Sequence, residues 1–349
     1  MSGSEPVVVG ILYPSAWYGD PAGFDEQVAA LRALDPRVEV VAEAYVGAFG
    51  AQATRPADGS DAHPSAEVLT DAQSAALGRI EVALTLDLPD DLASVAPRLR
   101  WVQAIGAGVN HLEPKVAATD VRLTTNGGSN AVGIAEFVMA RILEHCKPLD
   151  EIAGFQRDHA WEPRYGRQLA GSTIALLGFG PINQAVAARA IAFGMRVKVV
   201  RRSAGEPPPG IDSMLGADGL LPTLAASDIV VAAVPETPES TGMVGATEFA
   251  AMPAGAFFCN VGRGSLVDEA ALIAALESGH LGGAAIDVTS AEPLPAENPL
   301  WDAPRLRISA HCSSVPSAMF PEVHRLFREN LARYLADEPL ASEVAVQRG

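Results

Sequence analysis

Short apolar runs alternate with amphipathic segments along most of the chain. Runs typical of β-strands lie at residues 7–13, 38–41, 82–86, 99–105, 174–177, 197–200, 229–234, 256–261, 283–288 and 306–309. Apolar residues recur at helical spacing in the segments 25–34, 132–146, 182–193 and 317–335. Continuous apolar strands that alternate with helices predict parallel β-sheets covered by helices.

Capping and turn residues define several ends of these elements. Thr70 and Gln73 have the spacing of a capping box, which predicts the start of a short helix. Asn130 is a candidate cap for the long helix that follows it. Gly194 is expected to close the preceding helix as a C′ glycine. Residues 44–65 are rich in small residues without a sustained period, so we expect a long loop or an insertion there.

We expect two domains, because 349 residues with 48% hydrophobic content suffice for two cores. Residues 131–311 show the regular alternation that predicts a Rossmann-type doubly wound parallel sheet. Residues 1–130 and 312–349 are predicted to form a smaller α/β domain of flavodoxin-like type. This domain is discontinuous, because the final helix is expected to pack back on the first third of the chain.

A glycine turn follows the strand at 174–177 and precedes a helix. Gly178 and Gly180 lack a Cβ, so the backbone can approach a pyrophosphate that binds at the helix N-terminus. Asn183 stands where the third glycine of this pattern is expected, which argues against tight packing of the helix on the sheet. The same spacing occurs in ordinary tight turns, and the strand–turn–helix context favours a dinucleotide site over that alternative.

The strand after this helix ends in Arg201, Arg202 and Ser203. A carboxylate at this position would bind the ribose 2′-hydroxyl of NAD, whereas a guanidinium group binds a 2′-phosphate. A pair of solvated arginines at a strand end is the plain alternative. The position predicts NADP(H) in preference to NAD(H).

The strand at 99–105 runs into a second glycine-rich segment, Gly106-Ala107-Gly108. Such a loop at the carboxyl end of a strand presents backbone N–H groups to a small anion. A flexible turn fits these residues equally well, and the pattern alone leaves both interpretations open.

Charged and polar residues follow three later strands. They are Arg263, Asp287 with Glu292, and His311. Singly, each fits a surface charge or a hydrogen-bonded histidine at a strand end. Together they match the reduction of a ketone beside a carboxylate, which needs a cation, a proton donor and a group that keeps the donor protonated. His311 can donate the proton, Glu292 can raise the pKa of His311, and Arg263 can clamp the carboxylate.

Charge and cysteine content narrow the class of protein. A net charge of −17 argues against nucleic acid or an anionic membrane as the partner. Cys146, Cys259 and Cys312 lack the spacing of a disulfide framework or a thiolate zinc site, so we expect no metal and a reducing compartment. The N-terminus lacks the features of a signal peptide and no segment is expected to span a bilayer, so we predict a cytoplasmic protein.

These motifs, in this order, resemble those of the D-isomer-specific 2-hydroxyacid dehydrogenase family, which includes glyoxylate/hydroxypyruvate reductases and phosphoglycerate dehydrogenase. The likeness extends from about residue 101 to 314 and is weak before residue 69. It is carried by the glycine turn, residues 106–112 and 135–140, Asn260-Val-Gly-Arg-Gly-Ser-Leu-Val-Asp, Ala285-Ile-Asp-Val, Glu292-Pro-Leu and His311.

The resemblance implies roles for individual residues. It implies that Arg263, Glu292 and His311 are catalytic. It also implies that backbone amides of one loop hold the substrate carboxylate, in the segment Ile105, Gly106, Ala107 and Gly108. The expected cofactor contacts, from the motifs and the resemblance together, are Gly178, Gly180, Pro181, Ile182, Arg201, Arg202, Ser203, Val234, Pro235, Thr241, Cys259, Val261, Asp287 and Ser313. The family is usually homodimeric, so we expect a homodimer.

We therefore predict an NADPH-preferring reductase of glyoxylate, hydroxypyruvate or a similar small 2-oxoacid. Glu292 differs from the glutamine of the related formate dehydrogenases. We expect no regulatory domain after Gly349, and this expectation disfavours a serine-regulated phosphoglycerate dehydrogenase. Pro181 and Asn183 depart from the family pattern, so we expect a lower cofactor affinity. The alternative is a dinucleotide-sensing binding protein that resembles the family's corepressors, which retain the same three catalytic residues.

Overall fold

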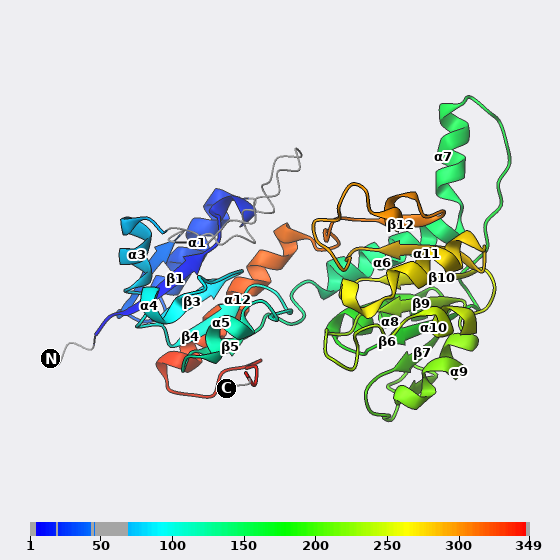
Figure 1. The fold of residues 1–349 in the computed structure, drawn as a ribbon. Coiled ribbons are helices and arrows are strands. Elements are labelled where there is room, and N and C mark those ends of the chain that lie inside the picture. The colour runs from blue at the N-terminus through cyan, green and yellow to red at the C-terminus, as the bar shows by residue number, and fades with distance from the viewer. Residues whose placement is uncertain (1–4, 19, 43–44, 46–68, 347–349) are drawn as a thin grey trace. The chain divides into compact units, whose positions relative to one another are not determined.

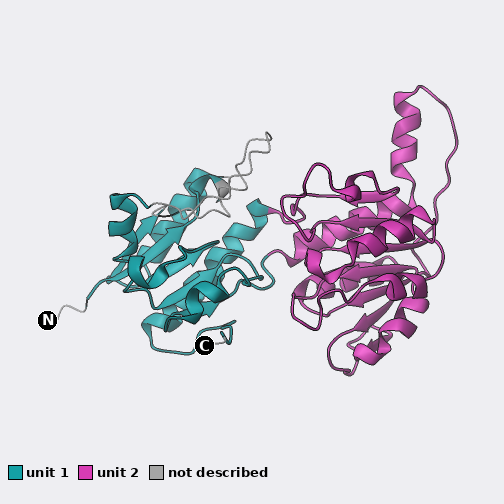
Figure 2. Cartoon of the chain, viewed as in Figure 1, with its two compact units in different colours: residues 1–129, 316–349 teal, residues 130–315 magenta. Residues whose placement is uncertain are grey.

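The computed structural model describes residues 5–18, 20–42, 45 and 69–346. These residues form two compact units (Figure 2), one of residues 1–129 and 316–349 and the other of residues 130–315. All ten predicted strands are present, each within two residues of its predicted ends. The loop predicted at residues 44–65 lies outside the described residues apart from Tyr45.

The first unit is built on a five-stranded parallel sheet in the order β2-β1-β3-β4-β5. The order confirms the flavodoxin-like type. The strands are β1 (Val7–Leu12), β2 (Val38–Ala42), β3 (Val82–Thr85), β4 (Trp101–Ala104) and β5 (Arg122–Thr124). The helices are α1 (Pro21–Arg32), α3 (Asp71–Leu77), α4 (Leu92–Val95), α5 (Glu113–Ala117) and α12 (Pro316–Leu335), with a 3-10 turn η1 (Ser15–Tyr18).

Helices cover both faces of this sheet (Figure 1). On one face α1 and the C-terminal helix α12 pack against β1, β3 and β4, and the core includes Trp101, Phe320 and Phe327. On the other face α3, α4 and α5 contribute the buried residues Leu77, Leu92 and Val116. Because α12 carries apolar residues at helical spacing, its buried side lies against β1, β3 and β4. These strands precede α12 by more than 200 residues in the sequence.

The second unit is built on a seven-stranded parallel sheet in the order β12-β11-β10-β9-β6-β7-β8. The order reverses between β6 and β9, which confirms the doubly wound Rossmann type. The strands are β6 (Thr173–Leu177), β7 (Arg196–Val200), β8 (Ser213–Leu215), β9 (Ile229–Ala232), β10 (Ala256–Asn260), β11 (Leu281–Ile286) and β12 (Leu306–Ile308). The helices are α6 (Ala131–Cys146), α7 (Leu149–Arg157), α8 (Pro181–Ala192), α9 (Leu220–Ala225), α10 (Ala246–Ala251) and α11 (Glu269–Glu277), with 3-10 turns η2 (Ala217–Gly219), η3 (Gly264–Leu266) and η4 (Pro299–Asp302).

Successive side chains of each strand point to opposite faces of this sheet. In β6, Ile174 and Leu176 pack under α6 and α8, whereas Ala175 and Leu177 pack on the side of α10 and α11. A strand that is buried on both faces has no polar side, which is why the sequence shows continuous apolar runs rather than alternation.

Some local predictions were confirmed and others were wrong. Thr70 and Gln73 form the predicted capping box, and Gly194 has the positive φ of 73° that a C′ glycine adopts. Asn130 precedes α6, but its side chain makes no capping hydrogen bond and its Oδ1 is buried without a partner among the described residues. Asn130 itself has helical dihedral angles, whereas a capping residue needs an extended backbone.

The pattern missed the short strands β5 and β8, each of three residues, and the helix α7. Helix α7 has no buried residue and projects from the second unit (Figure 1). No helix among the described residues is long and apolar enough to cross a bilayer.

Candidate active site

The second unit gathers most of the predicted site residues at one edge of its sheet. Gly178 follows β6, Arg263 follows β10 by three residues, Asp287 follows β11 directly and His311 follows β12. Because these strands are parallel, their carboxyl ends lie at the same edge, where open α/β sheets bind ligands.

The glycine turn has the geometry that its two glycines require. Gly178 has φ +85°, and a Cβ there would lie 2.7 Å from Val234 Cγ1 and 2.9 Å from Ala233 O. A Cβ at Gly180 would meet nothing within 4 Å, and no side chain caps α8. The turn therefore leaves open space in front of an uncapped helix N-terminus, and this space fits a phosphate group.

Asn183 corrects the expectation of loose packing at this turn. It is fully buried, and its Nδ2 donates to the carbonyl oxygens of Leu177 at 2.8 Å and Gly178 at 2.9 Å. The side chain thus ties the first turn of α8 to the end of β6, while Val186 and Ala190 of the helix lie in the core. An amide replaces the close approach that a glycine would allow.

Arg201, Arg202 and Ser203 are exposed at the end of β7, beside the glycine turn. Among the described residues, the guanidinium groups of Arg201 and Arg202 make one hydrogen bond, a long one from Arg201 Nη1 to Met214 Sδ at 3.8 Å. Glu239 faces this cluster: hydrogen bonds from its own backbone and from Thr237 lower the pKa of its carboxyl, and the charge of Arg202 lowers it further. The predicted contacts Val234, Pro235 and Thr241 belong to the same loop as Glu239.

His311 and Glu292 form a close pair, with 2.8 Å between His311 Nδ1 and Glu292 Oε2. The hydrogen bond to Glu292 raises the pKa of His311; desolvation and the charge of Arg263 oppose this rise, and the carboxylates of Glu292 and Asp287 add to it. Desolvation acts to raise the pKa of Glu292, but the hydrogen bond and charge of His311, the Thr289 N–H and Arg263 together lower it. The side chains are 48% and 35% exposed, so both can meet a substrate.

The loop that carries His311 is wound around the buried carboxylate of Asp287. Oδ1 accepts from Ser309 Oγ at 2.6 Å and from Cys312 N at 3.0 Å, and Oδ2 accepts from Ser313 N at 3.1 Å. His311 N donates to the Asp287 carbonyl at 2.8 Å, and His311 has a positive φ of 50°. These contacts hold His311 in a left-handed conformation that residues with a Cβ adopt infrequently.

Arg263 is held by a residue to which the sequence pattern assigned no role. Buried Asn260 donates from Nδ2 to Arg263 O at 2.8 Å and accepts at Oδ1 from Gly262 N at 3.0 Å. The guanidinium lies close enough to Glu292 and His311 to influence the pKa of both. The sequence signal that could have identified this role is an asparagine within an apolar strand, three residues before the arginine, because a buried amide needs hydrogen-bond partners.

Two other predicted cofactor contacts are buried. Cys259 has no exposed surface, and burial raises the pKa of its thiol to about 12, so the thiol stays protonated. Its side chain belongs to the core beneath α6 and α8 together with Val261. Any contact with a ligand at this position would therefore involve the backbone rather than the thiol.

The predicted substrate loop lies in the first unit, after β4. Ile105 N donates to Thr85 O at 2.9 Å, and Gly106 O accepts from Asn126 N at 3.0 Å. Within the part of the chain that the structure describes, the N–H groups of Gly106, Ala107 and Gly108 have no acceptor. Free backbone N–H groups of this kind suit a carboxylate.

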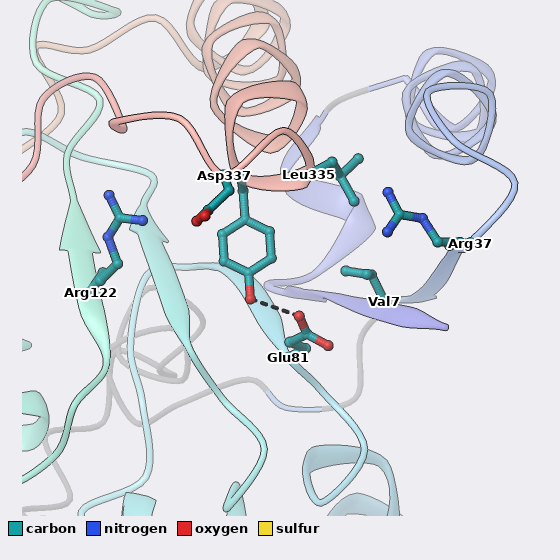
Figure 3. A pocket seen from close by; sticks show the side chains of 7 residues that line it. Val7, Arg37, Glu81, Arg122, Leu335 and Asp337 are labelled. Atoms are coloured by element: carbon teal, nitrogen blue, oxygen red, sulfur yellow. Dashed lines mark hydrogen bonds between the residues drawn. The ribbon is translucent and has the colours of Figure 1, made fainter. Parts of the chain in front are cut away.

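A hollow of about 260 Å³ also lies in the first unit, lined by Val7, Arg37, Glu81, Arg122, Tyr334, Leu335 and Asp337 (Figure 3). Tyr334 Oη donates to Glu81 at 2.7 Å across it. Four of its lining residues lie at the amino ends of β1, β2, β3 and β5, opposite the edge that carries residues 105–108, and the other three lie at the C-terminal end of α12. Among the described residues no group of three His, Cys, Asp or Glu side chains is arranged to hold a metal ion.

Comparisons with known proteins agree with this geometry. The family described as "D-isomer specific 2-hydroxyacid dehydrogenase, NAD binding domain" matches residues 139–313. Glyoxylate/hydroxypyruvate reductase A of Serratia proteamaculans is 30% identical over 254 residues, which cover 70% of this chain and 80% of that protein.

Solved structures show the same likeness over the whole chain. A D-isomer specific 2-hydroxyacid dehydrogenase family protein from Aeromonas salmonicida superposes with a TM-score of 0.81 at 26% identity, covering 98% of this chain and 100% of that one. An NADPH-dependent glyoxylate/hydroxypyruvate reductase from Sinorhizobium meliloti, solved with NADP and sulfate, superposes with a TM-score of 0.74 at 26% identity and covers 98% of both chains.

Proposed function

The chain belongs to the D-isomer-specific 2-hydroxyacid dehydrogenase family and is an NAD(P)H-dependent oxidoreductase, and we propose that it reduces a small 2-oxoacid to the D-2-hydroxyacid. The observation that carries the proposal is the Glu292–His311 pair, 2.8 Å apart and within the field of Arg263. The comparisons give no support to the alternative of a dinucleotide-sensing binding protein.

His311 acts as the proton donor in this proposal. Its Nδ1 is engaged by Glu292, so Nε2 is the nitrogen that delivers a proton to the carbonyl oxygen of the substrate. Glu292 favours the protonated imidazole, and Arg263 holds the substrate carboxylate and the polarised carbonyl. When bound, the nicotinamide cofactor supplies the hydride to the carbonyl carbon. The proton lost by His311 is replaced from solvent, which reaches its half-exposed side chain.

We also propose that the amides of Gly106, Ala107 and Gly108 bind a carboxylate. Their N–H groups lack acceptors among the described residues, and a carboxylate would satisfy them. The names of the relatives, glyoxylate/hydroxypyruvate reductases, support glyoxylate or hydroxypyruvate as the substrate class.

The test is a panel of small 2-oxoacids with NADPH and NADH, followed by the loss of reduced-nicotinamide absorbance. We expect turnover of glyoxylate or hydroxypyruvate. His311→Ala should remove most of this turnover, by about 10²-fold or more, while NADPH binding is retained. No turnover of any acid would contradict the proposed reaction, and an unaffected His311→Ala variant would contradict the role of the histidine.

We also propose that NADPH is the preferred cofactor. The exposed guanidinium groups of Arg201 and Arg202 follow β7 at the position that meets a ribose 2′-phosphate. Arg201→Ala with Arg202→Ala should raise the KM for NADPH by about 10- to 100-fold and leave the KM for NADH nearly unchanged. Arg196→Ala is the control, because Arg196 is exposed on the same strand at its other end. Equal losses with both cofactors would argue against the phosphate contact.

The homodimer implied by the family resemblance is also part of the proposal, and we assign its interface to the arm of residues 147–167. Trp161 is fully exposed and Tyr165 is 90% exposed, while Leu149 and Ile152 of α7 are nearly half exposed. Monomeric proteins seldom present so many large apolar side chains on one projecting element. A second copy of the chain is the partner that the proposal requires.

The arm is organised by its own contacts. Arg164 lies 5.1 Å from the ring centre of Phe155 and pairs with Glu151 at 2.6 Å, so the returning segment is fixed against α7. At the base, Arg167 N donates to Cys146 O at 2.9 Å. A surface that is ordered before association loses less conformational entropy on binding.

Light scattering after size-exclusion chromatography tests this interface. We expect the chain to be a dimer and the Trp161→Ala, Tyr165→Ala variant to be largely monomeric. Trp301→Ala is the control, because Trp301 is a half-exposed tryptophan outside the arm. A monomeric wild-type chain, or an arm variant that remains a dimer, would overturn the assignment.

A further inference from the structure

The turn that carries Glu292 stands at the surface of the second unit. Ser290, Ala291 and Glu292 are exposed, and only Thr289 at the start of the turn is buried. Thr289 N donates to Glu292 Oε1 at 3.1 Å, and Thr289 Oγ1 donates to Ala291 O at 2.7 Å. The orientation of the Glu292 carboxylate therefore depends on the position of the Thr289 backbone.

One segment outside this turn touches its backbone at two places. The first is Gly264, next to Arg263: a Cβ there would lie 2.0 Å from Thr289 C and 2.4 Å from Ser290 N. The second is Glu269, the first residue of α11, whose Oε1 accepts from Ser290 N at 2.7 Å. The segment 263–269 thus carries a catalytic cation at one end and a hydrogen-bond acceptor for the turn at the other.

The contact from Glu269 is specific to the turn and is not needed to cap α11. Asp268 caps this helix by accepting from Ala271 N at 3.0 Å. Within the described part of the chain, the Glu269 side chain accepts one hydrogen bond, from Ser290 N. A side-chain oxygen that accepts a backbone N–H restrains the backbone of a surface turn.

We propose that Glu269 is a positioning residue: its hydrogen bond to Ser290 N holds the turn 289–292 so that Glu292 meets His311. The role rests on the proposed reaction, in which His311 must be protonated. If the turn moves away, Glu292 no longer favours the imidazolium, and the pKa of His311 falls toward its ordinary value. The charge of Glu269 is not required, because any oxygen acceptor at this distance makes the contact.

The distinction between contact and charge defines the experiment. Glu269→Ala removes the acceptor, whereas Glu269→Gln removes the charge and keeps an amide oxygen. Glu248→Ala is the matched control. Glu248 lies in the first turn of α10 and also accepts a backbone N–H, from Gly245 at 3.0 Å, but it does not contact residues 289–292. For each variant, kcat/KM for the 2-oxoacid is measured against pH, together with the Kd for NADPH.

We expect Glu269→Ala to lower kcat/KM by about tenfold or more, because His311 becomes a less efficient general acid. The Kd for NADPH should not change. The pH at which its activity declines should move downward. Glu269→Gln and Glu248→Ala should keep the wild-type profile. A Glu269→Ala profile that matches Glu248→Ala, or equal losses in both Glu269 variants, would overturn the inference.

An NMR titration of His311 separates this inference from the proposed function. The His311 signal is assigned by its absence in His311→Asn and followed against pH in wild type and Glu269→Ala. A lower midpoint in Glu269→Ala supports the positioning role even if no 2-oxoacid is turned over. An unchanged midpoint refutes it, whether or not the wild-type chain is an active reductase.

Discussion

Replacing Asn183 by glycine restores the third glycine of the dinucleotide-binding pattern, and we predict that it destabilises this protein. The pattern alone would lead to the opposite expectation, since glycine permits close packing of helix on sheet. In this chain the Asn183 side chain fills that position and donates two hydrogen bonds, to Leu177 O and Gly178 O.

The magnitude follows from these contacts. Each neutral hydrogen bond contributes about 1 kcal/mol, so losing two costs about 2 kcal/mol. Leu177 O keeps Ala233 N as a donor, but Gly178 O loses the donor it has among the described residues. Removing Asn183 Oδ1, which is buried without a described partner, offsets that loss by a similar amount. Asn183→Ala should thus cost about 2 kcal/mol, and Asn183→Gly about 3 kcal/mol because glycine is a poorer helix former.

Urea denaturation followed by circular dichroism measures these differences. Gln184→Ala is the control: Gln184 is the neighbouring amide, and its hydrogen bond to Phe179 O at 3.0 Å is exposed, so we expect a change below about 0.5 kcal/mol. An Asn183→Gly variant as stable as wild type would show that the two hydrogen bonds are not what holds α8 on β6.

Three further predictions concern protonation and charge. Burial lowers the pKa of His324 from 6.5 to about 4. The neutral imidazole therefore contributes fully to the free energy of unfolding above pH 6.5. This contribution, of up to about 3 kcal/mol, is lost as the pH falls through 4. His324→Gln, which keeps a partner for Tyr13 Oη, should lose less stability over that range in urea titrations. Glu292→Gln should lower kcat by about 10²-fold and should make activity decline at lower pH than in wild type, as a pH profile would show. Because the pKa of His311 is raised, wild-type reduction should persist above pH 6.5 and fall only as the pH exceeds that raised value; a decline centred at 6.5 would contradict the effect of Glu292.

The order of elements was predictable because buried strands leave an unbroken apolar signal. The strands with five or six buried residues, such as β6 and β10, were found from the sequence. The three-residue strands β5 and β8 were missed, although β12, which is equally short, was found. Helix α7 was missed although Leu149, Ile152 and Phe155 recur in it at helical spacing.

The charged residues of the site were predictable for a topological reason. Parallel strands bring their carboxyl ends to one edge, so Arg263, Asp287 and His311 could be placed together from strand ends alone. The consequence of Asn183 was not predictable, because sequence spacing does not show where an amide group points. The contact of Glu269 with Ser290 was missed for the same reason: it joins a helix start to a loop 21 residues away.

The polar residues beneath the site, both predicted and missed, share one physical role. Where a strand of the sheet ends, the chain leaves the ladder of backbone hydrogen bonds, and the N–H groups of the next residues need other acceptors. In this unit polar side chains supply them: Asn260 accepts from Gly262, Asp287 from Cys312 and Ser313, and Glu269 from Ser290. Each of these acceptors fixes the backbone close to a side chain that the proposed reaction uses. Substituting any of them should therefore impair catalysis, and the site extends into the polar residues beneath it.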